Sequence, residues 1–174
     1  MRLQSASIAL ALALACGVAW AQGGPTDPQI AGIVVAANQI DVDAGKLAKA
    51  RTKNKDVRAF ANQMVTDHTA VNKQAAALVK KLHVKPVESD TSKGLKSGAR
   101  DNMANLRKLK GVQFDRAYVD HEVAYHQAVL DAIDKTLIPN AQNAELKDLL
   151  TKVRPAIAAH LDHAKHLQSS LGKG

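Results

Sequence analysis

Apolar residues recur every three or four positions along most of the chain, which is the period of an amphipathic helix. This pattern predicts four long helices, over residues of about 28–51, 54–82, 113–138 and from 143 to the C-terminus. A shorter helix is expected between about residues 90 and 111. Since no segment alternates apolar and polar residues over a useful length, no sheet is predicted.

The connections between these segments indicate how they pack. Residues 52–54 and 139–142 are short enough to form tight helical hairpins, whereas residues 83–92 begin a long connection. Ser89 or Asp90 can cap the shorter helix, and Pro155 is expected to bend the last helix. Two hairpins joined by a long connection predict an all-α fold, a four-helix bundle with a crossover connection and an extra short helix.

Several polar residues fall on the apolar helix faces that are expected to be buried in the core, and each long helix contributes at least one. A buried polar group without a partner costs roughly 1–3 kcal/mol, so such residues need one another, a water or a metal. Placed by helical angle, the set consists of Asp41, His68, His160 and either His121 or His126. Glu122 lies between the two apolar stripes of the third long helix.

The choice between His121 and His126 stays open. Counted from the second hairpin, His121 is almost level with His160, whereas His126 is displaced by about 9 Å. Residues 64–71 (MVTDHTAV) resemble residues 122–129 (EVAYHQAV), however, and this internal similarity makes His126 the counterpart of His68. Depth therefore favours His121, and the internal similarity favours His126.

The N-terminus has the pattern of a secretory signal peptide. Arg2 precedes the short apolar run at residues 8–15, and residues 19–21 (AWA) form a small-x-small cleavage site. We therefore expect residues 1–21 to be a signal peptide and residues 22–174 to be a single domain without a transmembrane segment. Cys16, the only cysteine, is an alternative lipidation site.

The chain is basic, with a formal net charge of +8. The charge is spread over the helices and few aromatic residues accompany it, so nucleic-acid binding is not expected. A basic surface is attracted to anionic surfaces. We expect an exported, periplasmic protein that associates loosely with an anionic envelope surface, including that of the outer membrane.

The inner polar residues suggest metal chemistry. Imidazole and carboxylate groups suit zinc, copper, iron or manganese, and helical bundles often hold such sites in their cores. The Glu-x-x-His pairs of carboxylate-bridged di-iron proteins do not occur in this chain. No serine lies in a nucleophile elbow either, so we expect a binding protein and not an enzyme.

Three ordered blocks carry a resemblance to a known family. They are FANQMVTDHT at residues 60–69, FDRAYVDHEVAYHQ at residues 114–127 and PAIAAHLDHAKHL at residues 155–167. Together they resemble the bacterial ferritin-like family DUF4142, a domain of unknown function whose members are often described as exported or outer-membrane proteins. The resemblance spans about residues 27–167. It implies a ferritin-like bundle exported to the periplasm, with recurrent positions at Asp67, His68, Asp115, Tyr118, His126 and His160. The first helix of relatives often has Glu where this chain has Asp41.

Two functional hypotheses follow. In the first, the protein is a periplasmic metal-associated or stress-related binding module. Its ligands are His68, His126 and His160, joined by Asp41 or Glu122, with His121 as the alternative to His126. In the second, the protein is a structural or interaction bundle whose inner histidines only form hydrogen bonds within the core.

Overall fold

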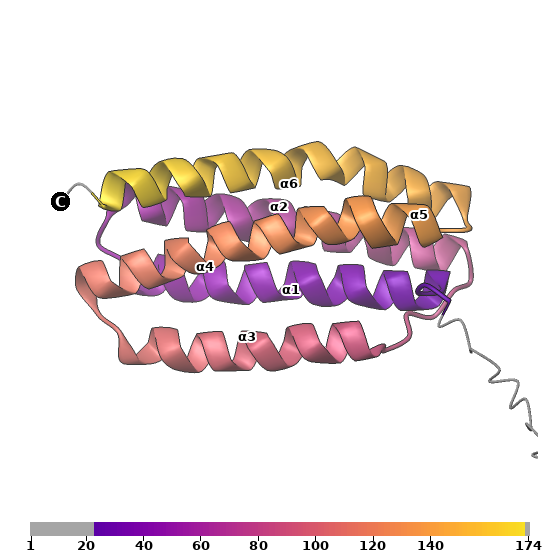
Figure 1. Cartoon of the computed structure of the whole chain (residues 1–174), viewed down its shortest axis with the longest axis horizontal. Coiled ribbons are helices and arrows are strands. Elements are labelled where there is room, and N and C mark those ends of the chain that lie inside the picture. The colour runs from indigo at the N-terminus through magenta and orange to yellow at the C-terminus, as the bar shows by residue number, and fades with distance from the viewer. Residues whose placement is uncertain (1–22, 173–174) are drawn as a thin grey trace, which may run out of the picture.

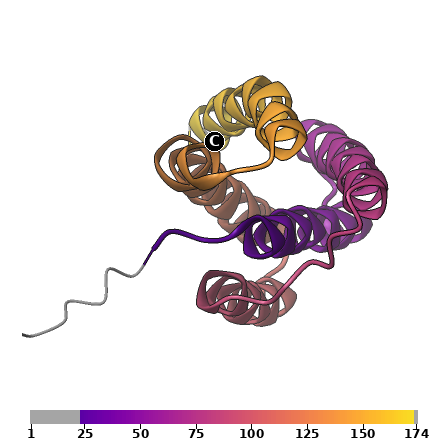
Figure 2. The same ribbon diagram turned by 90° about the vertical axis from the view of Figure 1, so that its right-hand side faces the viewer.

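The computed structural model describes residues 23–172, which form a bundle of helices (Figure 1). The predicted signal peptide lies outside the described residues. Four long helices lie side by side and α3 lies against the outer side of α1 (Figures 1 and 2). Residues 23–172 contain no strand, and the all-α prediction is confirmed. The elements are α1 (Asp27–Arg51), α2 (Lys55–Lys81), α3 (Asp90–Lys108), α4 (Gly111–Ala132), η1 (Ile133–Leu137), α5 (Ile138–Asn140) and α6 (Ala144–Leu171).

Two similar caps shape the hairpins α1–α2 and α4–α6. The Asn54 side chain accepts hydrogen bonds from two backbone amides at the start of α2, and Asn143 does the same at the start of α6. Asparagine at this position satisfies amides that lack a partner within the helix. The Asp27 carboxylate also accepts hydrogen bonds from the backbone amides of Gln142 and Asn143. It thereby ties the start of α1 to the second hairpin.

The third long helix continues beyond its predicted end. We expected it to stop before Pro139, but η1 and α5 carry it to Asn140. η1 is a π-helical turn in which the Ile138 amide donates to the Ile133 carbonyl. Proline has no amide hydrogen and its ring crowds the carbonyl four residues earlier. The wider π turn before Pro139 makes room for that ring, so the helix continues. Pro155 likewise lies inside the continuous α6.

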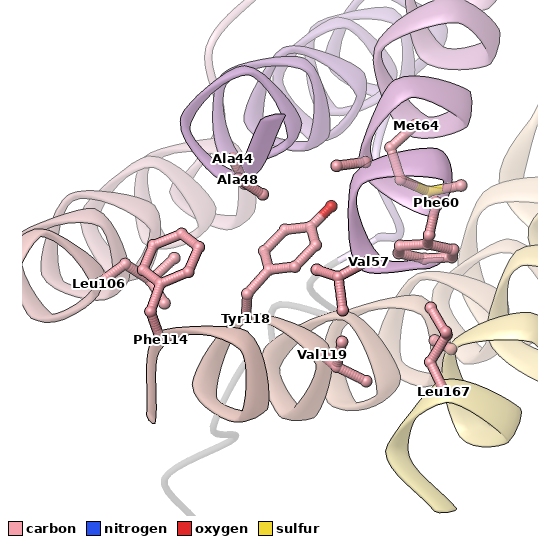
Figure 3. Close-up of a cluster of buried hydrophobic side chains, with 12 residues drawn as sticks. Ala44, Ala48, Val57, Phe60, Met64, Leu106, Phe114, Tyr118, Val119 and Leu167 are labelled. Carbon is pink, nitrogen blue, oxygen red and sulfur yellow. The ribbon is translucent and has the colours of Figure 1, made fainter. Parts of the chain in front are cut away.

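The core has two apolar clusters with a polar layer between them. One cluster, at the α1–α2 turn, is built around Phe60, Phe114 and Tyr118 (Figure 3). The other, at the α4–α6 turn, includes Ile30 and Ile133. Along the long helices Asp41, His68, Glu122, His126 and His160 fall between the positions that enter the two clusters. The bundle therefore surrounds these polar groups with apolar packing above and below.

Candidate metal centre

Five ionisable side chains meet at mid-height in the bundle, and all four long helices contribute. Asp41 comes from α1, His68 from α2, Glu122 and His126 from α4, and His160 from α6. None of the five is more than 3% exposed. Interactions between charges and dipoles are strong in such surroundings because the local dielectric is low.

The three imidazoles face one another across the core. Their ring centroids are 5.6 Å apart for His68 and His126, 5.2 Å for His68 and His160, and 5.5 Å for His126 and His160. One ring nitrogen from each lies within 4.8 Å of the corresponding nitrogens of the other two. Three histidines from three helices thus bring one potential ligand atom each into a single group.

The hydrogen bond of His68 determines which of its nitrogens carries the proton. Its Nδ1 lies 2.7 Å from the Asn38 Oδ1 atom. The Asn38 amide group donates to the Val34 carbonyl at 2.8 Å, so Asn38 Oδ1 is an acceptor. His68 Nδ1 must therefore donate, and in the neutral ring Nε2 keeps a free lone pair.

The same argument fixes the other two rings. His126 Nδ1 lies 3.0 Å from the backbone carbonyl of Glu122, and His160 Nε2 lies 2.9 Å from the Asp67 carboxylate. Both partners are acceptors, so these nitrogens are donors. The remaining atoms are His126 Nε2 and His160 Nδ1. Together with His68 Nε2 they have no hydrogen-bond partner among the described residues.

Burial keeps these histidines neutral. Desolvation, assisted by the neighbouring imidazoles, lowers the pKa of His68 to about 3. Desolvation lowers the pKa of His126 to about 4, although its bond to the Glu122 carbonyl opposes the shift. The pKa of His160 is also lowered by burial, against the opposing influence of Asp67. Neutral imidazole is the form that binds metal ions.

Two carboxyl groups flank the histidines. Burial, followed by the proximity of Glu122, raises the pKa of Asp41 well above its ordinary value. Burial raises the pKa of Glu122 to about 8, although contacts with Asp41 and Tyr118 partly offset this. Asp41 Oδ2 is 3.4 Å from His68 Nε2, and Glu122 Oε2 is 3.4 Å from His126 Nδ1. Oxygen atoms of both carboxyl groups also lie within 4.8 Å of a ring nitrogen of His126.

The structure places His126, not His121, in this cluster. His121 is half-buried and stacks on Tyr125 with a centroid distance of 5.5 Å. The internal similarity therefore pointed to the residue that faces the other histidines, and the depth argument did not. The depth count assumed that the helix ends before Pro139. With the helix continued to Asn140, His121 and His126 stand at similar distances from the level of His160, about 3 Å and about 4.5 Å, so the count no longer separates them.

Asp67 has a role that residue-level reasoning did not assign. Helical angle did not place it among the inward polar residues, but it accepts a hydrogen bond from His160, across from α2 to α6. Its side chain is 42% exposed, so it lies at the margin of the polar layer. The resemblance to a known family was the only sequence signal for this position. Asp115, another recurrent position implied by the resemblance, is buried.

The arrangement defines a class of protein: a ferritin-like helical bundle with a buried imidazole and carboxylate cluster. The chain belongs to the family DUF4142, a domain of unknown function, which matches residues 17–167. No curated protein is significantly similar to it.

A solved structure supports the same fold. It is that of a DUF305 protein from Streptomyces coelicolor, provisionally described as secreted. The two chains are 14% identical, the similarity covers 83% of this chain and 92% of the other, and the TM-score is 0.69. At this identity the likeness concerns the fold. Among residues 23–172, none of the helices combines the length and apolarity needed to cross a bilayer.

Proposed function

We propose that this protein is an exported metal-binding module, acting in the periplasm, whose core binds one transition metal ion. His68, His126 and His160 are the proposed nitrogen ligands, and Glu122 or Asp41 supplies an oxygen ligand. Two observations carry the proposal: one ring nitrogen of each histidine lies within 4.8 Å of one ring nitrogen of the other two, and each of the three rings has a nitrogen without a hydrogen-bond partner among the described residues. Buried ring nitrogens with free lone pairs are unfavourable unless a cation or a proton donor lies beside them.

The donor set favours a particular kind of ion. Neutral imidazole suits zinc, copper, iron or nickel, and a carboxylate also admits manganese. Tetrahedral zinc has metal–nitrogen bonds of about 2.0–2.1 Å, which puts ligand nitrogens roughly 3.3 Å apart. The three ring nitrogens lie within 4.8 Å of one another. Each pair of nitrogens therefore has to approach by at most about 1.5 Å to reach the spacing of zinc ligands.

The hydrogen bonds behind the rings support the same conclusion. Metal-binding histidines usually donate their second ring nitrogen to a carboxylate, a backbone carbonyl or another fixed acceptor. Here Asn38, the Glu122 carbonyl and Asp67 provide one such acceptor for each ring. Export is supported by the signal-like N-terminus and by the provisional description of the DUF305 protein as secreted.

A metal titration tests the proposal. Chelator-treated protein is titrated separately with Zn²⁺, Cu²⁺, Fe²⁺ and Mn²⁺, and binding and melting temperature are measured. We expect one ion per chain for at least one metal, with an increase in unfolding free energy of about 2.7 kcal/mol at a free concentration 100 times Kd. His166→Ala, which removes an exposed histidine of α6, should leave both quantities unchanged. Failure of all four metals to bind stoichiometrically would favour a structural bundle with histidines hydrogen-bonded in the core.

A second prediction concerns Asp67. Asp67→Asn should weaken metal binding about 10- to 100-fold, because loss of a carboxylate behind a ligating histidine weakens orientation and basicity of the ring. The one-to-one stoichiometry should remain, since Asp67 is not itself a proposed ligand. Asp101→Asn, the same change at an exposed position on α3, is the control. Equal affinities for the two variants would show that Asp67 does not position His160.

A further inference from the structure

A cavity of about 220 Å³ lies beside the candidate metal centre. Its walls come from α1, α2, α3, α4, η1 and α6, and most of them are aliphatic. It reaches Asp41 and His68 at one end, and two of its wall residues, Thr91 and Ala128, are exposed. The cavity therefore extends from the protein surface toward the buried cluster. Representative apolar wall residues are Val34, Val71, Leu95, Ile133, Leu150 and Ile157.

The size of the cavity limits the ligand. An apolar cavity of roughly 150 Å³ in another protein stays dry and binds benzene, whereas sites for drug-sized ligands have volumes of about 300–1,000 Å³. A volume of about 220 Å³ therefore fits a molecule with one or two rings. A long acyl chain or a nucleotide is too large.

The lining also limits the charge of the ligand. No Lys or Arg is among the described residues that line the cavity, so an anion finds no partner there. Asp41 is the only acidic residue among the described residues that line the cavity, and its carboxyl group already lies 3.4 Å from His68 Nε2, so an organic cation would lose its hydration between aliphatic walls for a single contact. A buried charge without a partner is strongly unfavourable. A neutral ligand meets neither penalty.

The polar end provides few free hydrogen-bonding groups. Asn38 is used by Val34 and His68, and the Tyr125 hydroxyl donates to the Ala37 carbonyl at 3.2 Å. The Asp41 carboxyl group contacts Glu122 but also lines the cavity, as does His68, whose Nε2 atom has no hydrogen-bond partner among the described residues. A ligand with a single polar group can therefore direct it at these atoms while its rings contact the aliphatic walls.

The π turn lies in the cavity wall. Ile133, Thr136 and Leu137 belong to η1 and all three line the cavity. A π turn widens a helix locally and often occurs at functional sites. Here the π turn reorients the side chains that form the cavity wall at the end of α4.

We propose that this cavity binds a neutral, largely apolar organic molecule with one or two rings and a single hydrogen-bonding group directed at Asp41 and His68. Binding to the cavity does not depend on the proposed metal, and metal-free protein is the first form to test. A metal on His68 would lie at the polar end of the cavity and is expected to change the affinity for a ligand with an oxygen donor.

The test compares three probes of similar shape by ligand-observed NMR and calorimetry. Phenol, which is neutral at pH 7, should bind the metal-free protein in the micromolar to low millimolar range. Benzoate and benzylamine, an anion and a cation at this pH, should bind at least tenfold more weakly. Equal binding of all three probes would overturn the proposal, as would absence of phenol binding.

Cavity-filling variants locate the bound probe. Ala132→Leu adds bulk to a half-buried wall position at the end of α4 and should weaken phenol binding at least tenfold. Ala124→Leu makes the same change at an exposed position of α4 that does not line the cavity, and it should leave phenol binding unchanged. Ala37→Leu fills the cavity from α1 and replaces Ala132→Leu if that variant does not fold. Unaltered phenol affinity in a folded cavity variant would contradict the proposed location. Metal stoichiometry, measured in parallel, separates failure of this site from failure of the metal centre.

Discussion

Replacing His126 with alanine is expected to lower metal affinity by more than 100-fold. Loss of a group that only supports a metal ligand already lowers metal affinity about 10- to 100-fold. His126 is itself a proposed ligand, so its loss should have a larger effect. It is fully buried, one of its ring nitrogens has no hydrogen-bond partner among the described residues, and its ring lies beside both other imidazoles. His126 also belongs to both groups of potential ligand atoms, one with His68 and His160 and one with Asp41 and Glu122. Its removal therefore disrupts either coordination set.

The measurement is a competition titration with a chromogenic chelator, accompanied by circular dichroism to verify folding. His121→Ala is a close control, because His121 lies on the same helix but outside the cluster. It should retain affinity within a few-fold of the parent protein. His126→Gln, which leaves a smaller void, is used if the alanine variant unfolds. A folded His126 variant with parental affinity would eliminate the proposed site.

Replacing Glu122 with glutamine is expected to change how the stability of the metal-free protein depends on pH. Burial raises the pKa of Glu122 from 4.5 to about 8 in the folded protein. Between these values the folded state holds a proton that the unfolded state releases. The stability associated with protonated Glu122 is therefore complete below about pH 4.5 and is lost as the pH rises toward 8, with a slope of at most about 1.4 kcal/mol per pH unit.

Glutamine has the shape of protonated glutamic acid and does not titrate. Glu122→Gln should therefore match the parent protein at pH 4.5 and exceed its unfolding free energy by several kcal/mol at pH 8, on the order of the integrated slope. Urea denaturation at a series of pH values measures this difference. Gln127→Glu, an exposed change on the same helix, controls for overall charge. A pH-independent difference between the parent and Glu122→Gln would refute the assigned pKa shift.

If Glu122 is a ligand, metal should make the parent protein more stable than Glu122→Gln, which reverses the order expected without metal. A cation favours the ionised carboxylate, so binding releases the proton and the parent protein gains more stability from metal than Glu122→Gln does. If Asp41 supplies the oxygen ligand instead, both proteins should gain equally. The comparison thus assigns the oxygen ligand independently of the histidines.

The chain's own pattern was enough to predict the helices and their connectivity. Apolar residues at intervals of three and four specified each long helix, and the short segments before Asn54 and Asn143 specified the hairpins. The exception was the end of the α4 region. Proline chemistry alone predicted a stop at Pro139, but a π turn that widens the helix lets it continue. Local rules cannot anticipate such a turn, because packing of Ile133 and Leu137 in the core helps to hold it.

For the candidate site, the sequence alone determined which polar residues face inward, because the angle around a helix follows directly from residue spacing. Asp41, His68 and His160 were identified in this way. Only the tertiary structure decided between His121 and His126, and only it joined Asp67 to His160. Those facts depend on the axial offset and rotation between helices, which side-chain packing across the whole bundle fixes. The cavity beside the cluster depends on the same packing, since all its walls come from different parts of the chain.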